Sequence, residues 1–281
     1  MSSAPTTAPA IDPVAFRAFE RAAHSSKAGS YNGLFAAVTN RANEPLLDAA
    51  QVRAGTRVLD VAAGPGHLTG AAAARGADAI GTDLAPAMVA LARELYPGIR
   101  FEEASADALP FADGAFDAVL CAFGMGHFPE AERVAAEFAR VLAPGGIVAI
   151  SWWEGFTRNR INGIFHEVIG RLAKSVPGTV PVGPPMDRFS DPVRFADLLS
   201  ATGFDDAKVT SVSFTHHLRD ADALWDLAMG SFARASATIG AQDETVRRQI
   251  RAEVARAAQR YAGTDGLDIP VAFLIASGTK R

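Results

Sequence analysis

Apolar residues in the first half of the chain fall in short runs, and stretches with helical spacing separate these runs. The runs predict strands at residues 56–61, 79–83, 99–104, 116–122 and 146–151. Helices are predicted between them, from residue 65 onward and over residues 86–95 and 130–142. Short buried strands that alternate with helices are typical of a parallel sheet covered on both faces. The pattern therefore predicts an α/β core.

The segments around this core have a different pattern. Two helices are expected before it, at residues 14–28 and 33–50. After it we expect a helix at 158–174 and a Pro/Gly-rich connection at 176–188. Pro192 then opens another helix, with Ser190 or Asp191 as its cap. The remaining predicted elements are a strand at 203–214, helices at 220–239 and 243–261, and a last strand at 269–277. The late helices amount to a cap inserted between the final strands.

These elements suggest a division of the chain into four parts. Residues 1–13 are rich in Ser, Thr, Ala and Pro and are expected to form a disordered tail. Residues 14–50 are N-terminal helices, and residues 51–151 are a cofactor-binding core. Residues 152–281 complete the core with its last strands and carry helical cap insertions at 152–190 and 218–264.

Composition narrows the class of protein. The 281 residues are 49% apolar and 21% charged, as in soluble globular proteins. A net charge of −4 without a basic run argues against a nucleic-acid partner. The single cysteine, Cys121, excludes a disulfide framework and a cysteine-based zinc site. With no membrane-spanning stretch and no signal-peptide pattern, we expect a cytoplasmic protein.

Acidic residues follow the predicted strands in an ordered way. Asp60 lies at the end of the first strand, Asp83 ends the second, and Asp107 follows the third. The carboxyl ends of parallel strands meet at one edge of a sheet, so these side chains are expected to form a line there. A carboxylate at Asp83 can accept both hydroxyls of a ribose, and one at Asp107 can accept the exocyclic amine of adenine.

Glycines after the first strand complete this nucleotide-like site. Gly64 and Gly66 let a ligand approach the backbone just before a helix N-terminus. The dinucleotide fingerprint G-x-G-x-x-G needs a third glycine at position 69, where Thr69 stands. The motif therefore argues against a nicotinamide cofactor.

Four segments carry a family resemblance: LDVAAGPGHL, GTDLAPAMV, ASADALPFADGAFDAV and EFARVLAPGGIVAIS. In this order they resemble class I S-adenosylmethionine-dependent methyltransferases, particularly the ubiquinone/menaquinone-type small-molecule group, over residues 57–151. The resemblance implies a Rossmann-like seven-stranded, mostly parallel sheet with helices on both faces, an antiparallel last strand, and a helical cap inserted after strands 5 and 6. Ala62 replaces the first glycine of the usual D-x-G-x-G-x-G motif, and an alanine is tolerated there if its φ is negative.

The same resemblance implies S-adenosylmethionine as the cofactor and assigns its contacts. Asp60 and residues 63–66 would hold the methionine end, Asp83 the ribose, and Asp107 with its neighbours the adenine. The implied cofactor-binding residues are Tyr31, Asp60, Ala62, Ala63, Gly64, Gly66, Asp83, Leu84, Met88, Ala106, Asp107, Ala108, Cys121, Ala122 and Phe123.

Methyl transfer from a sulfonium is an in-line displacement that depends on positioning and on exclusion of water, and it needs no metal. A hydroxyl, phenol or amine acceptor usually needs a proton removed, a carbon acceptor loses one after attack, and a histidine with its ordinary pKa of roughly 6.5 can accept it. His127, just after the fourth predicted strand, is the candidate catalytic base. The alternative is that His127 caps the next helix or only lines the cofactor pocket.

The cap residues point to an apolar acceptor. Trp152 and Trp153 could stack on a flat or isoprenoid molecule, although neighbours on a strand face opposite ways, so one should pack in the core. The cap segments contain many further aromatic and apolar residues. The predicted acceptor pocket consists of Trp152, Trp153, His166, Met186, His216, Trp225 and Met229.

We therefore expect methyl transfer to a small hydrophobic molecule of aromatic, quinone-like, isoprenoid or other secondary-metabolite type. An enzyme of the same fold that catalyses a non-methylating cyclisation or rearrangement is the alternative. A dehydrogenase is disfavoured by Thr69, and a binding-only or protein-modifying role by the apolar cap. The acceptor atom stays open between oxygen, nitrogen and carbon, and a second copy of the chain could cover the cap in a homodimer.

Overall fold

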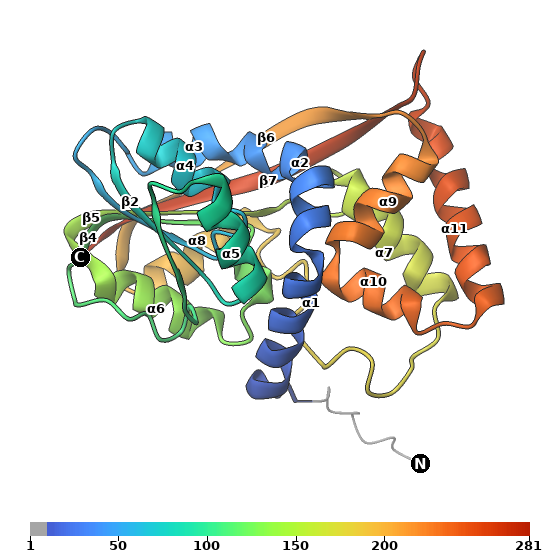
Figure 1. Cartoon of the computed structure of the whole chain (residues 1–281), viewed down its shortest axis with the longest axis horizontal. Coiled ribbons are helices and arrows are strands. Elements are labelled where there is room, and N and C mark those ends of the chain that lie inside the picture. Colours follow the sequence, from blue (N-terminus) through green and yellow to red (C-terminus); the bar gives the residue numbers. More distant parts are fainter. Residues whose placement is uncertain (1–9) are drawn as a thin grey trace.

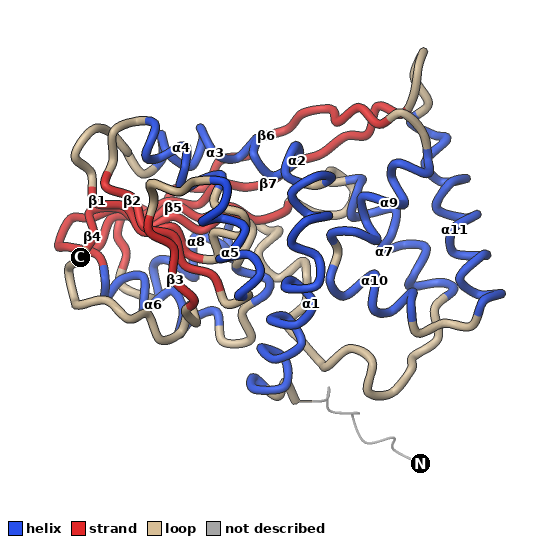
Figure 2. The backbone as a smooth tube through the Cα atoms, viewed as in Figure 1, coloured by secondary structure: helices blue, strands red, loops and turns tan. Residues whose placement is uncertain are grey.

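A computed structural model describes residues 10–281, so residues 1–9 of the expected tail lie outside the described part. The strands are β1 (Arg57–Val61), β2 (Asp78–Asp83), β3 (Arg100–Glu103), β4 (Phe116–Ala122), β5 (Leu142–Trp153), β6 (Phe204–Leu218) and β7 (Leu267–Lys280). They form one sheet in the order β3-β2-β1-β4-β5-β7-β6 (Figure 2). Pairs among β1 to β5 are parallel, whereas β7 runs antiparallel to both β5 and β6. The predicted α/β class and the antiparallel last strand are confirmed.

The sheet has its topological switch point beside β1. The chain moves outward from β1 through β2 to β3 and then returns to β4 on the other side of β1. Ligands of open α/β sheets bind in the crevice at the carboxyl ends of such strands. Val58 and Leu59 of β1 are fully buried, as expected for a central parallel strand.

Helices cover both faces of the sheet (Figure 1). Helices α3 (Asn43–Ala49) and α4 (His67–Ala74) lie on one face, and α6 (Ala131–Val141) and α8 (Pro192–Ala201) lie on the other. Helix α5 (Pro86–Leu95) packs against β2 and β3. Asp191, rather than Ser190, caps α8 by accepting the Val193 and Arg194 amides.

The N-terminal helix α1 (Pro13–Leu34) stands between the sheet and the cap (Figure 1). It is longer than the predicted helix at residues 14–28, because tertiary contacts with α5 and α9 extend it through two glycines of low helix propensity. His67 Nε2 also lies 2.6 Å from Asn32 Oδ1, which ties the last turn of α1 to the start of α4. The predicted helix at residues 33–50 is instead divided into α2 (Ala36–Thr39), a 3₁₀ turn, η1 (Asn40–Ala42), and α3.

The cap comprises α7 (Arg160–Leu172), α9 (Ala221–Ser231), α10 (Ala233–Gly240) and α11 (Glu244–Ala258). Strands β6 and β7 extend beyond the sheet as a long two-stranded arm that reaches this cap (Figure 2). The prediction of one helix over residues 220–239 is wrong: Phe232, with φ −83° and ψ 105°, separates α9 from α10. Its ring packs against Phe35 and Phe165, a tertiary contact that overrides the helical periodicity. No helix in residues 10–281 is long and apolar enough to cross a membrane.

Candidate functional site

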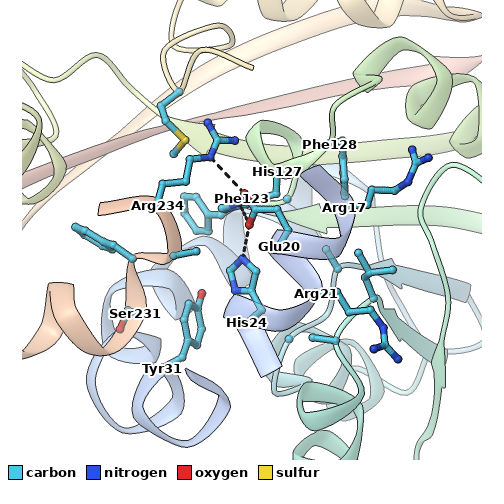
Figure 3. Close-up of a pocket in the computed structure, with 18 of the residues that line it drawn as sticks. Arg17, Glu20, Arg21, His24, Tyr31, Phe123, His127, Phe128, Ser231 and Arg234 are labelled. Carbon is cyan, nitrogen blue, oxygen red and sulfur yellow. Dashed lines mark hydrogen bonds and ion pairs between the residues drawn. The ribbon is translucent and has the colours of Figure 1, made fainter. Parts of the chain in front are cut away.

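A cavity of about 480 Å³ lies where the carboxyl ends of β1, β2 and β4 meet helix α1 and the cap helices α7 and α10 (Figure 3). This volume is within the range of small-molecule binding sites, ~300–1,000 Å³. Its lining changes from acidic and backbone groups at the sheet edge to aromatic side chains from the cap. The cavity is therefore suited to a ligand, or a pair of ligands, with one polar and one apolar part.

Most of the predicted cofactor residues line this cavity, namely Tyr31, Ala62, Gly64, Asp83, Leu84, Met88, Ala106, Asp107, Ala122 and Phe123. Asp60, Ala63, Gly66, Ala108 and Cys121 are absent from the lining. Gly66 instead packs against the core, where an added Cβ would approach the Phe101 ring to 2.7 Å. The glycine is needed for packing as well as for its φ of 84°.

Asp60 lies behind the cavity wall and is fully buried. Its Oδ2 accepts a hydrogen bond of 2.7 Å from Thr69 Oγ1, whereas its Oδ1 has no partner within residues 10–281. Burial raises the pKa of Asp60 to about 7, with the charge of Asp83 acting in the same direction. Direct contact with a ligand, as the resemblance implied for Asp60, does not follow from this placement.

Asp83 braces the loop after β1. Its two oxygens accept the Gly64 and Ala85 amides, each at 2.8 Å. Burial raises the pKa of Asp83, and the two amide hydrogen bonds oppose this shift. Because a carboxylate has about four acceptor positions, Asp83 can still accept hydroxyl groups from a ligand in the cavity.

Two lining residues have left-handed backbone conformations that are unusual for side chains with a Cβ. Ala62 has φ 58° and Phe123 has φ 55°. The condition of a negative φ at Ala62 is therefore not met, and the methyl group is accommodated under strain. Such strain typically costs ~1–2 kcal/mol per residue and concentrates at ligand sites. The left-handed conformation of Phe123 places its ring flat against that of Trp153, with 4.0 Å between the ring centroids.

Helix α1 pairs with the acidic rim. Arg17 Nη1 donates to Asp107 Oδ2 at 2.9 Å and to Glu130 Oε2 at 3.1 Å, and Arg21 forms an ion pair of 2.5 Å with Glu103. Figure 3 shows both arginines on the side of the cavity away from Tyr31 and Ser231. Asp107, which was predicted to accept a hydrogen bond from the adenine amine, thus already forms an ion pair with Arg17.

Aromatic side chains surround the other end of the cavity. Phe35, Phe123, Trp153, Phe165 and Phe232 all line it. Phe35 makes contacts of 5.6 Å with Trp153 and 5.3 Å with Phe232, measured between ring centroids. These five rings form a continuous aromatic wall, which favours a flat, apolar ligand.

Of the predicted acceptor residues, Trp153, His166 and Met186 line the cavity, and Trp152, His216, Trp225 and Met229 do not. Trp152 is fully buried and donates its Nε1–H to the Met186 carbonyl at 2.9 Å. The alternation of side chains along β5 turns it away from Trp153. His216 lies on β6, outside the lining of this cavity. Trp225 and Met229 belong to α9 but pack outside the cavity.

A charged cluster occupies the middle of the view in Figure 3. Glu20, from α1, is only 3% exposed and lies between two histidines. Its Oε2 is 3.1 Å from His24 Nε2 and 3.0 Å from His127 Nδ1, and Arg234 Nε approaches its Oε1 to 3.3 Å. The candidate base His127 is therefore part of a network that joins α1, the turn after β4 and α10.

Comparison with known proteins identifies the family. Residues 58–146 match a methyltransferase domain model. A demethylmenaquinone methyltransferase of Chlorobaculum parvum is 32% identical over 168 residues, which cover 56% of this chain and 69% of that protein. The chain belongs to the class I S-adenosylmethionine-dependent methyltransferases.

Other relatives of this methyltransferase match over a smaller part of their length. The chain spans about half of the demethylmenaquinone methyltransferase of Thermus thermophilus, with 46% identity over 110 residues that cover 37% of this chain and 50% of that protein. Among solved structures, the YcgJ protein of Bacillus subtilis superposes with a TM-score of 0.55 at 20% identity and covers 86% of this chain and 99% of its own. This likeness supports the fold.

Sequence reasoning missed the polar residues that the methyltransferase brings to its cavity from outside the matched domain, namely Arg17, Glu20, Arg21, His24 and Arg234. One signal was present: Glu20 and His24 are four positions apart in a predicted helix and so share one face. Nothing local to Arg234 indicates its partners, because they are distant in sequence. Besides Glu20, Arg234 donates to the Pro184 and Gly126 carbonyls, each at 2.7 Å.

Proposed function

We propose that this methyltransferase moves the methyl group of S-adenosylmethionine to a small apolar acceptor that carries an ionisable proton, such as a hydroquinone or a phenol. One observation carries the proposal. A single cavity joins the acidic carboxyl edge of the sheet to an aromatic pocket, with His127 in its wall. Donor and acceptor could thus meet without bulk water, as a displacement at a sulfonium requires.

The cofactor half fits an adenosyl sulfonium by its chemistry. Asp83 offers spare acceptor positions for ribose hydroxyls. The Asp83 carboxylate, which lines the cavity next to the loop after β1, provides negative charge that favours a cationic ligand. Bound S-adenosylmethionine would supply the methyl group and release a neutral thioether.

The acceptor half supports a flat, apolar substrate. Phe35, Phe123, Trp153, Phe165 and Phe232 provide ring surfaces on several sides. Relatives named demethylmenaquinone methyltransferases point in the same direction. A quinol-type acceptor would stack on these rings and place its acidic group toward the polar cluster at His127.

The chain's residues would then have three tasks. The aromatic wall orients the acceptor, the acidic edge holds the donor, and His127 removes the proton that the acceptor loses on methylation. A positioned base typically contributes ~10²–10⁴-fold to a rate. A base at this site is compatible with oxygen or carbon methylation, since both release one proton.

The test is an acceptor screen with purified protein and S-adenosylmethionine, read by mass spectrometry. 1,4-Naphthohydroquinone, substituted phenols and small amines are suitable probes. A product heavier by one methylene unit from a hydroquinone or phenol supports the proposal. A product of unchanged mass indicates cyclisation or rearrangement, and calorimetry in which NAD binds but S-adenosylhomocysteine does not would contradict the cofactor assignment.

A further inference from the structure

Two histidines share one carboxylate oxygen in the wall of the cavity. Glu20 Oε2 lies 3.1 Å from His24 Nε2 and 3.0 Å from His127 Nδ1. Burial alone would raise the pKa of Glu20, but the charges and hydrogen bonds of His127 and His24 outweigh it and hold that pKa far below its usual range. Glu20 is therefore a carboxylate at neutral pH and can only accept hydrogen bonds.

This arrangement determines where the histidine protons lie. To bond with an ionised carboxylate, His127 must donate from Nδ1, and His24 must donate from Nε2. In a neutral imidazole, the proton on Nδ1 leaves Nε2 without one. Within residues 10–281, Nε2 of His127 has no hydrogen-bond partner, and the side chain lines the cavity.

We propose that Glu20 is a positioning residue that fixes His127 as the Nδ1–H tautomer and thereby makes Nε2 the base for the acceptor proton. This inference rests on the proposed function and deepens it. As the bond between acceptor and methyl carbon forms and the sulfur–methyl bond breaks, the acceptor proton moves to Nε2 and its bonding electrons stay on the acceptor. The imidazolium formed at His127 then lies against the Glu20 carboxylate, which stabilises it.

The surrounding charges divide the roles of the two histidines. His127 faces Glu20 and His24 from α1, Arg234 from α10 and Asp83 from β2. Burial lowers the pKa of His24, but the hydrogen bond and charge of Glu20 outweigh it, so the net shift is upward. For His127 burial dominates, and His24 and Arg234 add to it, so its pKa is lowered despite Glu20. His24 thus takes the positive charge first, and His127 stays neutral and able to accept a proton.

Glu20, His24 and His127 could instead form a metal site, because their donor atoms lie within 4.8 Å of one another. The charges argue against this use. Arg234 already provides a positive charge at Glu20, and a sulfonium donor would bring another into the same cavity. A divalent cation would leave buried positive charge without compensation, which is costly. A proton on His24 adds one positive charge, half of what a divalent cation would add.

Nuclear magnetic resonance of ¹⁵N-histidine-labelled protein, titrated with pH, tests this inference without any acceptor. His24→Asn and His127→Asn assign the two rings. We expect neutral His127 to carry its proton on Nδ1, and we expect Glu20→Gln to lower the pKa of both histidines by about one unit or more. Glu20→Asp should restore part of the shift. Glu130→Gln is the matched control, because it removes a carboxylate from the same cavity at Arg17 and should leave both titrations in place.

Three results would overturn the inference. The first is a proton on Nε2 of neutral His127, and the second is that Glu20→Gln leaves the pKa of both histidines unchanged. The third is that stoichiometric Zn²⁺ shifts the resonances of both histidine rings in wild type but not in Glu20→Gln. The last would assign a metal site. An acceptor screen that yields no methylated product would contradict the proposed function and leave the tautomer of His127 as measured, so the two failures are distinguishable.

Discussion

Asp60 should make the stability of the protein depend on pH in a way that one substitution removes. Its side chain is fully buried, and burial raises its pKa from the ordinary 3.8 to about 7. The folded state therefore holds this proton more tightly than the unfolded state does. The stabilisation from the bound proton is complete below pH 4 and is lost as the pH rises to about 7.

The size of the effect follows from the same pKa values. Each pKa unit corresponds to ~1.4 kcal/mol of differential interaction between protonation states. The difference between about 7 and 3.8 thus amounts to about 4 kcal/mol. No allowance for solvent screening is needed, since Asp60 is 0% exposed. Above about pH 7 the contribution becomes constant.

Urea unfolding of wild type and Asp60→Asn between pH 4 and pH 9 measures this term. Asparagine keeps a carbonyl oxygen for Thr69 but does not titrate. The free energy of unfolding of Asp60→Asn relative to wild type should therefore rise by about 4 kcal/mol from pH 4 to pH 8. A flat difference between Asp60→Asn and wild type across this pH range would refute the reasoning.

Three further substitutions, one of them with a matched control, have defined outcomes. Ala62→Gly relieves the positive φ of 58° and should stabilise the fold by ~0.5–1 kcal/mol in urea unfolding; a loss of stability would contradict the strain. Gly126→Ala would place a Cβ 2.0 Å from the Trp152 ring and should cost ~1–3 kcal/mol by the same measurement, whereas Gly155→Ala, with no atom within 4 Å, should stay within ~0.5 kcal/mol. Asp83→Asn should weaken S-adenosylhomocysteine binding by ~10-fold or more in calorimetry, and unchanged affinity would remove Asp83 from the cofactor site.

The core of the fold was predictable because its signals are local. Alternating strand and helix patterns located β1, β2 and β4 within a residue or two. The strand-end acid Asp83 and the glycine Gly64 line the cavity as their positions indicated. Parallel topology alone brings such residues to one edge, so no knowledge of long-range contacts was needed.

The rest of the site depends on contacts between distant segments. Glu20 meets Arg234 across the cap interface, and no local periodicity encodes that encounter. Tertiary packing also overrode local signals, as where Phe232 interrupts a helical pattern to join the aromatic wall. Ala62 was misjudged for a related reason, since its backbone conformation is imposed by the surrounding fold rather than by its own preference.

Helix α1 has a consequence for how relatives of this protein should be compared. Its residues Glu20 and His24 line the cavity, yet they lie upstream of the matched domain at 58–146. Two chains with near-identical methyltransferase domains could thus catalyse different reactions if their N-terminal helices differ. Swapping that helix between homologues would test whether it carries part of the preference for an acceptor.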